Sequence, residues 1–242
     1  MCKELVEMLM ALGNAEVKAK VEYFFKTGKG QYGEGDQFIG LKVPTIRQTI
    51  KPYQHQLSPL DAELLVQSPF HEIRLAGLLI WVAQFKKAKD PQQRKAIVDL
   101  YLKNTKHVNN WDLVDLSCVE ILGGYLQGRP KDLLFKLSLS ESLWEQRIAM
   151  VTTLAFIRKN EHDTALLLCE HFLSHRHDLM HKASGWCLRE IGKKNKAALV
   201  AFLDQHAAIM PRTMLRYSIE KMDDEERKYY LDAKERASKQ KS

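Results

Sequence analysis

The chain has 242 residues, of which 45% are hydrophobic and 28% charged, as is ordinary for a soluble globular protein. Its 12 glycines and 7 prolines are few for this length, which disfavours a disordered chain or a turn-rich all-β fold and favours helices. The formal net charge of +7 favours anionic partners such as nucleic acid, although charge alone is weak evidence.

Membrane insertion and secretion are not expected. The most apolar stretch, Leu75 to Phe85, is too short to span a bilayer. The N-terminus has no basic leader followed by an unbroken apolar run, because Glu4 and Glu7 interrupt it. The cysteines form no CxxC pair, which favours free thiols in a reducing cytoplasm.

Helix start signals recur along the chain. Ser58, Ser68 and Asp90 each precede a proline, which suits the first helical position because the missing N–H would be unpaired there. Asn110 and Ser140 precede acidic residues, which the helix dipole favours in a first turn. Apolar residues then recur every three or four positions and never alternate with period two, which predicts an all-α fold of about twelve helices.

The segment from Thr27 to Lys42 differs from the rest, since it holds five of the twelve glycines. We expect a loop with several unusual backbone angles, closed by Pro44 at a new helix start. The order of its glycines does not match GxGxxG and no strand precedes it, so a nucleotide-binding fingerprint is rejected.

A repeat is the strongest sign of organisation. Arg74, Trp111, Arg147 and Lys182 follow one another at intervals of 37, 36 and 35 residues, each in the first turn or two of an expected helix. Such spacing suits two-helix repeats that bury their apolar faces against each other, which predicts an α-α superhelix, a HEAT-like solenoid. We expect one such domain over residues 1–242, with a frayed tail at 237–242.

The register of this repeat predicts a site. Asp115 and Trp186 both lie four residues after a repeat position, one turn along the same helix face. Two tryptophans, a carboxylate and several cations are therefore expected on one concave surface. A dry core does not gather such residues, and a solvated face does not need the tryptophans.

Four stretches of sequence carry a family resemblance. They are GKGQYGEGDQFIGLKVP (28–44), YLKNTKHVNNWDLVDLS (101–117), LWEQRIAMVTTLAFIRKN (143–160) and HKASGWCLREIGKKN (181–195). Together they resemble the DNA alkylation repair enzyme family, the AlkD-like alkylpurine DNA glycosylases built from HEAT-like repeats. The resemblance runs from about residue 4 to 236, and NNWDLVD and KxxGWxLREIGK are its most specific parts.

The resemblance implies roles for particular residues. It assigns the catalytic aspartate to Asp115, the two tryptophans that flank the damaged nucleotide to Trp111 and Trp186, and a DNA-backbone arginine to Arg147. We expect further backbone contacts from three basic residues, Lys42, Arg74 and Lys182. The resemblance also implies that the lesion is probed from the backbone side, without a base pocket.

One carboxylate suits this chemistry. An N3- or N7-alkylated purine is already cationic and leaves readily, so the enzyme has only to stabilise the oxocarbenium character of the sugar and orient a water molecule. Sugar hydrolases usually need a second carboxylate, because their leaving oxygen must be protonated. Trp111 and Trp186 suit a cationic lesion, since aromatic faces attract cations.

Each residue also has a structural interpretation. Asp115 can be an acidic residue near a helix N-terminus that the helix dipole stabilises, without any part in catalysis. The two tryptophans can be core residues, and Arg147 can join neighbouring repeats through an ion pair with Glu190. The histidines at 171, 175, 177 and 181 are dense enough to suggest a metal, but the segment is expected to span a turn. Solvated histidines are therefore favoured, with no metal and no cofactor.

Three functions are compatible with these observations. The first is a monofunctional glycosylase that excises alkylated purines from double-stranded DNA in the bacterial cytoplasm, acting as a monomer at the nucleoid. The second is a DNA-structure-binding protein of the same fold without catalysis. The third is a protein-interaction scaffold, a common use of helical solenoids.

Overall fold

The computed structural model describes residues 1–239, and in this part of the chain the regular structure is helical, with no strand and one isolated bridge between Gln37 and Phe70. The all-α prediction is confirmed, and the helices pack on their neighbours in sequence as an α-α superhelical repeat fold. No helix among residues 1–239 is long and apolar enough to cross a membrane.

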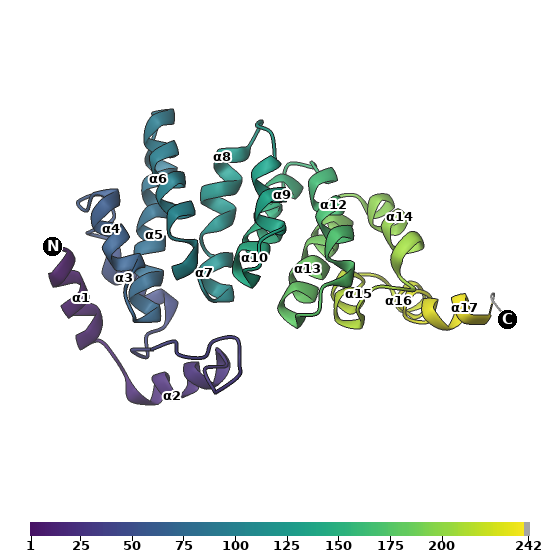
Figure 1. Ribbon diagram of the computed structural model, residues 1–242, viewed down its shortest axis with the longest axis horizontal. Helices are drawn as coiled ribbons and strands as arrows, with labels where there is room; N and C mark the ends of the chain where they lie inside the picture. The colour runs from purple at the N-terminus through teal and green to yellow at the C-terminus, as the bar shows by residue number, and fades with distance from the viewer. Residues whose placement is uncertain (240–242) are drawn as a thin grey trace. The chain divides into compact units, whose positions relative to one another are not determined.

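The chain divides into two compact units, Met1–Tyr125 and the residues from Leu126 onward. The expectation of a single domain therefore stays a prediction, and each unit is described by itself. The helices of the first unit are α1 Cys2–Ala11, α2 Ala15–Phe24, α3 Val43–Ile50, α4 Pro59–Val66, α5 His71–Lys87, α6 Pro91–Lys103 and α7 Trp111–Asp115 (Figure 1). A 3₁₀ turn, Thr105–His107, precedes α7, a π-helical stretch, Val119–Gly123, follows it, and α8 Gly124–Leu126 comes next.

Helix α5 forms the centre of the first unit. It packs against α3, α4, α6, α7 and the π-helical stretch, and 13 of its 17 residues are buried. Gly77 lets α4 approach closely, because a Cβ at this position would lie 2.8 Å from the carbonyl oxygen of Ala62. A helix apolar on nearly every side is expected at such a buried position.

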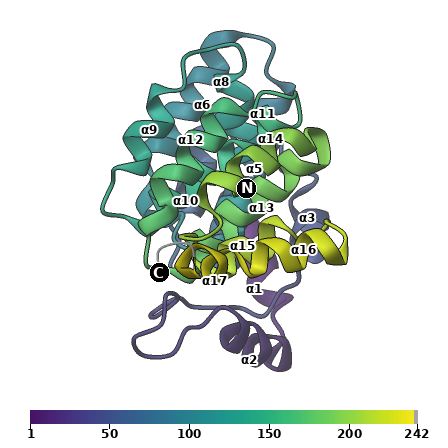
Figure 2. The same cartoon turned by 90° about the vertical axis from the view of Figure 1, so that its right-hand side faces the viewer.

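Helix α2 and the loop that follows it stand apart from the other helices of this unit, as Figures 1 and 2 show. The predicted loop is confirmed, with no helix between α2 and α3 and with positive φ at Gly30, Gly35 and Gly40. Both its backbone conformation and the space around it require a glycine at position 40. Its φ is +91°, and a Cβ there would lie 2.1 Å from the backbone oxygen of Asn14.

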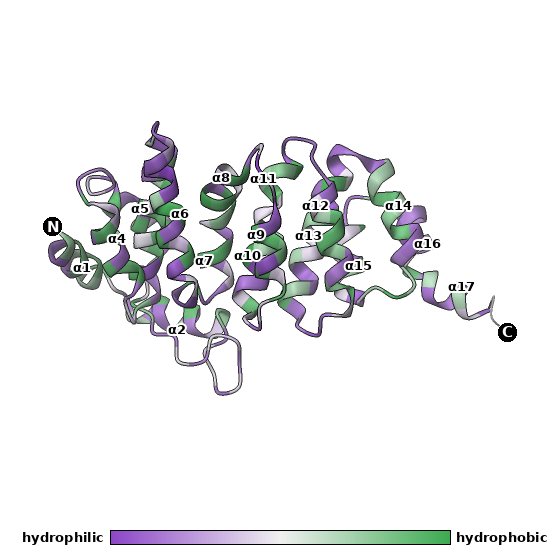
Figure 3. Cartoon of the chain, turned by 45° about the horizontal axis from the view of Figure 1, so that its top comes forward, coloured by the Kyte–Doolittle hydropathy of each residue, from purple (hydrophilic) through white to green (hydrophobic). Residues whose placement is uncertain are grey.

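The second unit contains α9 Asp132–Ser138, α10 Leu143–Thr152, α11 Leu154–Ile157, α12 Asp163–His171, α13 Asp178–Lys194, α14 Lys196–His206, α15 Arg212–Ser218, α16 Asp224–Leu231 and α17 Ala233–Lys239, with a 3₁₀ turn, Phe172–Ser174, after α12. Helix α13 is its centre and packs against α10, α12, α14 and α15. Hydrophobic and hydrophilic residues mix along α13 (Figure 3), because its apolar side faces these neighbours and its polar side does not.

Three of the five predicted helix starts are confirmed. Ser58, Asp90 and Asn110 are N-caps whose side chains accept a backbone N–H. The other two are wrong by two residues. Helix α5 begins at His71, and the hydroxyl of Ser68 accepts the N–H of Phe70. Helix α10 begins after the N-cap Ser142, whose own N–H donates to the Ser140 hydroxyl. In both cases the predicted cap supports a short turn ahead of the helix.

The structure has more helical segments than the twelve expected, because continuous helical runs are divided. The run from α7 to α8 is divided by π-helical turns, and α10 and α11 are divided at Thr153. The predicted frayed tail is helical at residues 237–239, which belong to α17, and its remaining residues, 240–242, lie outside the described residues.

Candidate active site

Helix α7 carries the two predicted site residues of the first unit. The Asn110 side chain caps this helix by accepting the N–H of Trp111 at 2.9 Å. Trp111 is the first residue and Asp115 the last, so the predicted spacing of one helical turn is confirmed. Both side chains are half-buried, and both line the same cavity.

This cavity has a volume of about 410 Å³ and is hereafter called the aromatic cavity. Its walls come from α2, the end of the glycine-rich loop, α3, α5 and α7. They are made by Val21, Phe24, Phe25, Phe38, Leu41, Lys42, Val43, Pro44, Ile46, His71, Glu72, Leu75, Trp111, Asp112, Asp115 and Leu116. Most of these side chains are apolar, and four are aromatic rings other than histidine.

The aromatic rings of the cavity are packed on one another. Phe25 stacks on Trp111 with ring centroids 5.2 Å apart and planes 20° apart, and it stacks on Phe38 at the same distance. Phe24 meets Trp111 edge-on at 5.6 Å. Offset stacks and edge contacts are the preferred aromatic geometries, so these contacts hold the indole in one orientation.

A cluster of buried charges lies behind this wall. The ring of His71 bridges two carboxylates, with Nδ1 2.8 Å from Asp36 and Nε2 2.9 Å from Asp112. Arg74 donates to the other oxygen of Asp36 at 2.6 Å. The side chains of His71 and Asp36 are each 2% exposed. With His71 protonated, two cations balance two anions, which buried charges require.

The surroundings favour that protonated state. Burial disfavours a charged imidazole, but the hydrogen bonds and charges of Asp112 and Asp36 outweigh it and raise the pKa of His71 to about 9. Burial likewise opposes ionisation of Asp36, yet His71 and Arg74 hold the pKa of that carboxyl below its usual value. The cluster joins the loop, α5 and α7 through the side chains of Asp36, His71, Arg74 and Asp112.

This linkage predicts a pH-dependent stability. A histidine with a higher pKa in the folded state binds its proton more tightly when folded. Its stabilising contribution is complete below about pH 6.5 and is lost as the pH rises through about 9. Between about pH 7 and 8.5 we expect the free energy of unfolding to fall by about 2 kcal/mol in urea titrations. His175 and His177, whose pKa values burial lowers, have released their protons by then. A stability that stays constant or rises over this interval contradicts a charged His71.

Glu72 fixes the end of the loop. Its carboxylate, 2% exposed, accepts the backbone N–H groups of Ile39, Gly40 and Leu41 at 2.9, 2.8 and 3.1 Å. Ionised acceptors make stronger hydrogen bonds than neutral ones. This contact holds the loop where it turns into α3, beside the aromatic cavity.

Sequence analysis missed the residues of this support. His71 and Glu72 belong to no motif that it recognised, and it gave no role to Asp36 or Asp112, although both lie in stretches that carry the family resemblance. Their pairing depends on contacts between residues far apart in the chain. One local signal was available. His71 and Glu72 open a helix that is apolar on nearly every side, so polar residues there had to find buried partners.

Two of the basic residues expected to contact DNA, Arg74 and Lys42, differ in their exposure to solvent. Arg74 is 4% exposed and donates to Asp36 and to the carbonyl oxygens of Ser68 and Pro69. Because its guanidinium is held by three internal acceptors, a phosphate contact by Arg74 is not part of the function proposed below. Lys42 is exposed and lies at the edge of the aromatic cavity.

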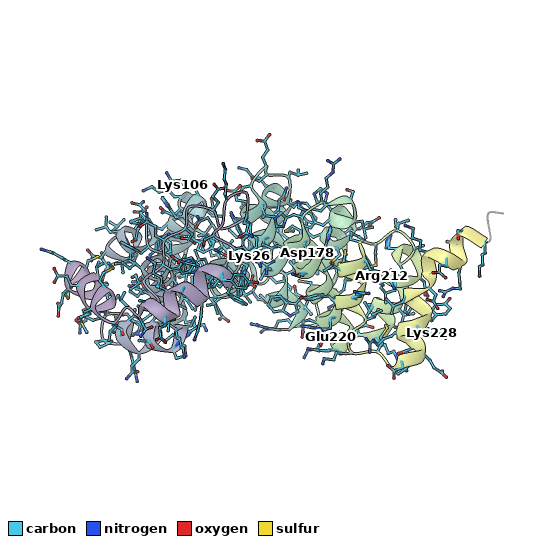
Figure 4. All side chains as sticks on the ribbon, turned by 90° about the horizontal axis from the view of Figure 1, so that it is seen from below. Lys26, Lys106, Asp178, Arg212, Glu220 and Lys228 are labelled. Atoms are coloured by element: carbon cyan, nitrogen blue, oxygen red, sulfur yellow. The ribbon has the colours of Figure 1, made fainter. Side chains whose placement is uncertain are left out.

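The other predicted site residues belong to the second unit. Trp186 is half-buried and lines a separate hollow of about 190 Å³ with Arg158, Glu190 and Lys194 among others. Lys182 forms an ion pair of 2.7 Å with Asp178, which Figure 4 labels at the start of α13. Lys182 and Trp186 are one turn apart on α13, as predicted, whereas the convergence of all four repeat positions on one surface stays a prediction.

Arg147 is more buried than its predicted role requires. It is 5% exposed, and its Nη1 donates to the carbonyl oxygen of Leu179 at 2.7 Å. This contact joins α10 to the first turn of α13. Glu190, the alternative partner considered from the sequence, pairs instead with Arg189 and Lys193. A phosphate contact by Arg147 is therefore not part of the function proposed below.

The dense histidines form a hydrogen-bonded turn before α13. His175 and His177 use Nδ1 to accept backbone N–H groups at 3.0 and 3.1 Å, and Nε2 of His181 lies close to the carbonyl oxygen of His175. These contacts build the turn and cap the helix. Across residues 1–239, no group of three or more His, Cys, Asp or Glu side chains is placed to hold a metal ion.

Fold and site together define an α-α superhelical protein with an aromatic cavity and a carboxylate at its wall. The chain belongs to the DNA alkylation repair enzyme family, whose model matches residues 5–222. A solved structure from Enterococcus faecalis, named a predicted DNA alkylation repair enzyme, resembles it with a TM-score of 0.67 at 16% identity, covering 88% of this chain and 97% of that one. At this identity the likeness concerns the fold. No curated protein matches the chain significantly.

Proposed function

We propose that the protein is a monofunctional DNA glycosylase that hydrolyses the N-glycosidic bond of cationic N3- or N7-alkylated purines in duplex DNA. One observation carries the proposal. Asp115 lies half-buried at the wall of an aromatic cavity, in a family that repairs alkylated DNA. The neighbouring carboxylates, Asp112 and Glu72, are engaged in structural contacts with His71 and the loop backbone.

The chemistry needs little more than this carboxylate. The bond between C1′ and the base nitrogen breaks, and its electron pair stays on the base, which leaves as a neutral molecule. Asp115 stabilises the positive charge that develops on the sugar and orients a water molecule towards C1′. The water oxygen forms the new bond to C1′, and its proton passes to the carboxylate or to solvent. No cofactor enters the reaction.

The positions of four further residues suggest how they bind the lesion and the DNA backbone. Trp111, held by Phe25 and Phe24, offers an aromatic surface to a cationic lesion. Exposed Lys42 at the edge of the cavity and partly exposed Lys182 on α13 are proposed to contact DNA phosphates, and Trp186 is proposed to contact the lesion nucleotide. The site's substrate is proposed to be duplex DNA, bound by a monomer.

The test is product analysis on methylated duplex DNA. We expect the wild-type protein to release free 3-methyladenine or 7-methylguanine, separated by chromatography, and to leave an intact strand that breaks only after alkali opens the abasic site. Strand breakage without alkali contradicts the monofunctional assignment. Binding of duplex DNA with no base released supports the non-catalytic alternative instead.

A further inference from the structure

The buried charge cluster reaches helix α7 from behind the aromatic cavity. We infer that Asp36, His71 and Asp112 form a positioning bridge for base release. The bridge holds α7 in the orientation that the reaction needs, and with it Asp115 and Trp111. This inference rests on the proposed function and adds to it the residues that set the geometry of its site. In this role the bridge acts through the groups that it holds, without touching the reacting atoms.

Helix α7 depends on its neighbours for its orientation. It has only five residues, and a helix of this length is not stable by itself in water. Leu113 and Val114 are fully buried and fix one side of the helix in the core. The contact on the cavity side is polar. There the carboxylate of Asp112 accepts from Nε2 of His71 at 2.9 Å and, with its other oxygen, from the N–H of Leu113 at 2.8 Å.

The imidazole of His71, at the centre of the bridge, is held on all sides. Its Nδ1 lies 2.8 Å from Asp36, and Arg74 donates to the other oxygen of that carboxylate at 2.6 Å. The ring stacks on Phe38 with centroids 4.5 Å apart and planes 20° apart, and the ring of Phe25 lies 4.9 Å away. A ring bonded at both nitrogens and packed between others gives the carboxylate on α7 a fixed partner.

Phe25 provides a second connection to α7. This ring packs against His71 and also stacks on Trp111, with centroids 5.2 Å apart and planes 20° apart. His71 therefore reaches the helix twice, by a hydrogen bond at Asp112 and through ring packing at Trp111. Asp115 lies one turn beyond Trp111, so a rotation of α7 would displace the carboxylate and the indole together.

Small errors of position are costly in catalysis. A displacement of about 1 Å can lower a rate about a hundredfold, even when the substituted residue is remote from the chemistry. A preorganised charge also acts only where it is already aimed at the developing charge. The bridge is therefore expected to control the rate of base release and not the affinity for duplex DNA, which phosphate contacts supply.

Two substitutions of Asp112 separate its position from its charge. Asp112→Ala removes the link to His71, and we expect single-turnover base release at saturating methylated DNA to fall about ten- to a hundredfold, with duplex affinity retained. Asp112→Asn keeps the link, because its amide donates to Nε2 of a neutral imidazole while its oxygen accepts the N–H of Leu113. Asp36 and Arg74 then remain as a balanced pair. Because position is kept, Asp112→Asn should release base within about threefold of the wild-type rate.

Glu63→Ala is the control for stability. Glu63 is 8% exposed and joins α4 to the end of α6, accepting from Asn104 at 2.7 Å and pairing with Lys103 at 3.0 Å, outside the aromatic cavity. Its substitution removes a buried carboxylate from the same unit and should lower the melting temperature without slowing base release. Equal release rates for Asp112→Ala and Glu63→Ala, or an Asp112→Asn as slow as Asp112→Ala, overturn the inference.

A double variant covers the case in which Asp112→Ala does not fold. His71→Phe/Asp112→Leu replaces both partners of the bond with apolar side chains, an exchange that buried ion pairs often tolerate, and it leaves Asp36 paired with Arg74. Its melting temperature should stay near that of wild type while base release is slow. Release at the wild-type rate by this folded variant would show that the bond does not position α7.

A spectroscopic measurement tests the bridge without DNA. A neutral imidazole has one N–H and can donate to only one of the two carboxylates, so deprotonation of His71 releases one end of the bridge. We therefore expect the ¹⁹F signal of Trp111, in protein labelled with 5-fluorotryptophan and assigned with Trp111→Phe, to shift with a midpoint at about pH 9. In Asp112→Asn, where the imidazole is already neutral, this transition should be absent. A constant wild-type signal, or the same transition in Asp112→Asn, contradicts the bridge.

The groups around His71 leave it as the one expected to titrate near this pH. The charged side chains beside it on the loop, α5 and α7 are carboxylates and a guanidinium, which in general titrate far from about pH 9: Asp36, Glu72, Arg74 and Asp112. On the 3₁₀ turn before α7, burial and the neighbouring cations lower the pKa of His107 from 6.5. His107 has therefore released its proton before the transition begins.

The failure of this inference is distinguishable from the failure of the proposed function. If wild type releases no base from methylated duplex DNA, the glycosylase assignment fails and the role in base release fails with it, whatever the ¹⁹F signal shows. If wild type releases base and a folded variant without the link releases it equally fast, the glycosylase stands and the bridge is overturned. Slow release by that variant together with rescue by Asp112→Asn supports both.

Discussion

Replacing Asp115 with asparagine should reduce base release from methylated duplex DNA by at least about a hundredfold, the effect expected when a preorganised electrostatic group at a reacting centre is removed. The asparagine would keep the size of the side chain but lose the negative charge that stabilises the sugar cation. Asp115 is only half-buried at the end of α7, so the fold should survive the change. Affinity for duplex DNA should be retained, because phosphate contacts supply most of it.

The measurement is single-turnover base release, with duplex binding followed in parallel. Asp99→Asn is the matched control, because Asp99 is exposed on α6, outside the aromatic cavity, and pairs with Lys95 within its own helix. Its release rate should equal that of wild type. If Asp115→Asn releases base as fast as wild type, Asp115 does not have the role proposed for it.

The second large effect is expected at His71. Replacing it with leucine should lower the free energy of unfolding by about 3–5 kcal/mol, because it removes one partner of a buried charge network. Asp36 and Asp112 would lose the imidazolium that lies within 2.9 Å of each, and Asp36 would keep Arg74 as a close cation. Part of the loss should be recovered at low pH, where the carboxyls become protonated and no longer need a counter-charge.

Urea or thermal unfolding measures this effect, and His162→Leu is the control. His162 is also buried, at 9% exposure, but its Nδ1 has no hydrogen-bond partner in the described chain and no carboxylate bridge depends on it. We expect a clearly smaller loss for His162→Leu. His162 lies in the second unit, and a comparable loss for the two variants would mean that burial of an imidazole ring, and not the charge network, accounts for the effect at His71.

The two predictions are linked by helix α7, which carries Asp115 and Asp112, a partner of His71. Asp112 and Asp115 are three positions apart on one short helix, and both line the aromatic cavity. Asp112 is 5% exposed and bonded to His71, whereas Asp115 is half-buried. Sequence spacing favoured Asp115 through its register and its family motif. The structure adds that the other aspartate of that motif is bonded to His71, and the catalytic role of Asp115 stays a prediction.

Most of the local signals in the sequence were confirmed, because they depend on neighbouring residues, although the starts predicted at Ser68 and Ser140 were wrong by two residues. A serine or aspartate before proline caps a helix through its own backbone, and this predicted the starts of α4 and α6 correctly. The dense glycines between Thr27 and Lys42 predicted the loop before α3, and Gly30, Gly35 and Gly40 there have positive φ. The repeat spacing placed Trp111 and Asp115, and Lys182 and Trp186, one turn apart on single helices.

The sequence by itself thus determined the helical class, the loop, the family and the residues of the catalytic hypothesis, since each follows from local patterns or a motif. The tertiary structure alone decided that Arg74 and Arg147 are buried, that Glu72 holds the loop and that His71 is a charged bridge. The physical reason is distance along the chain. His71 meets residues 35 and 41 positions away, and the protonation and burial of such groups depend on which partners folding brings to them.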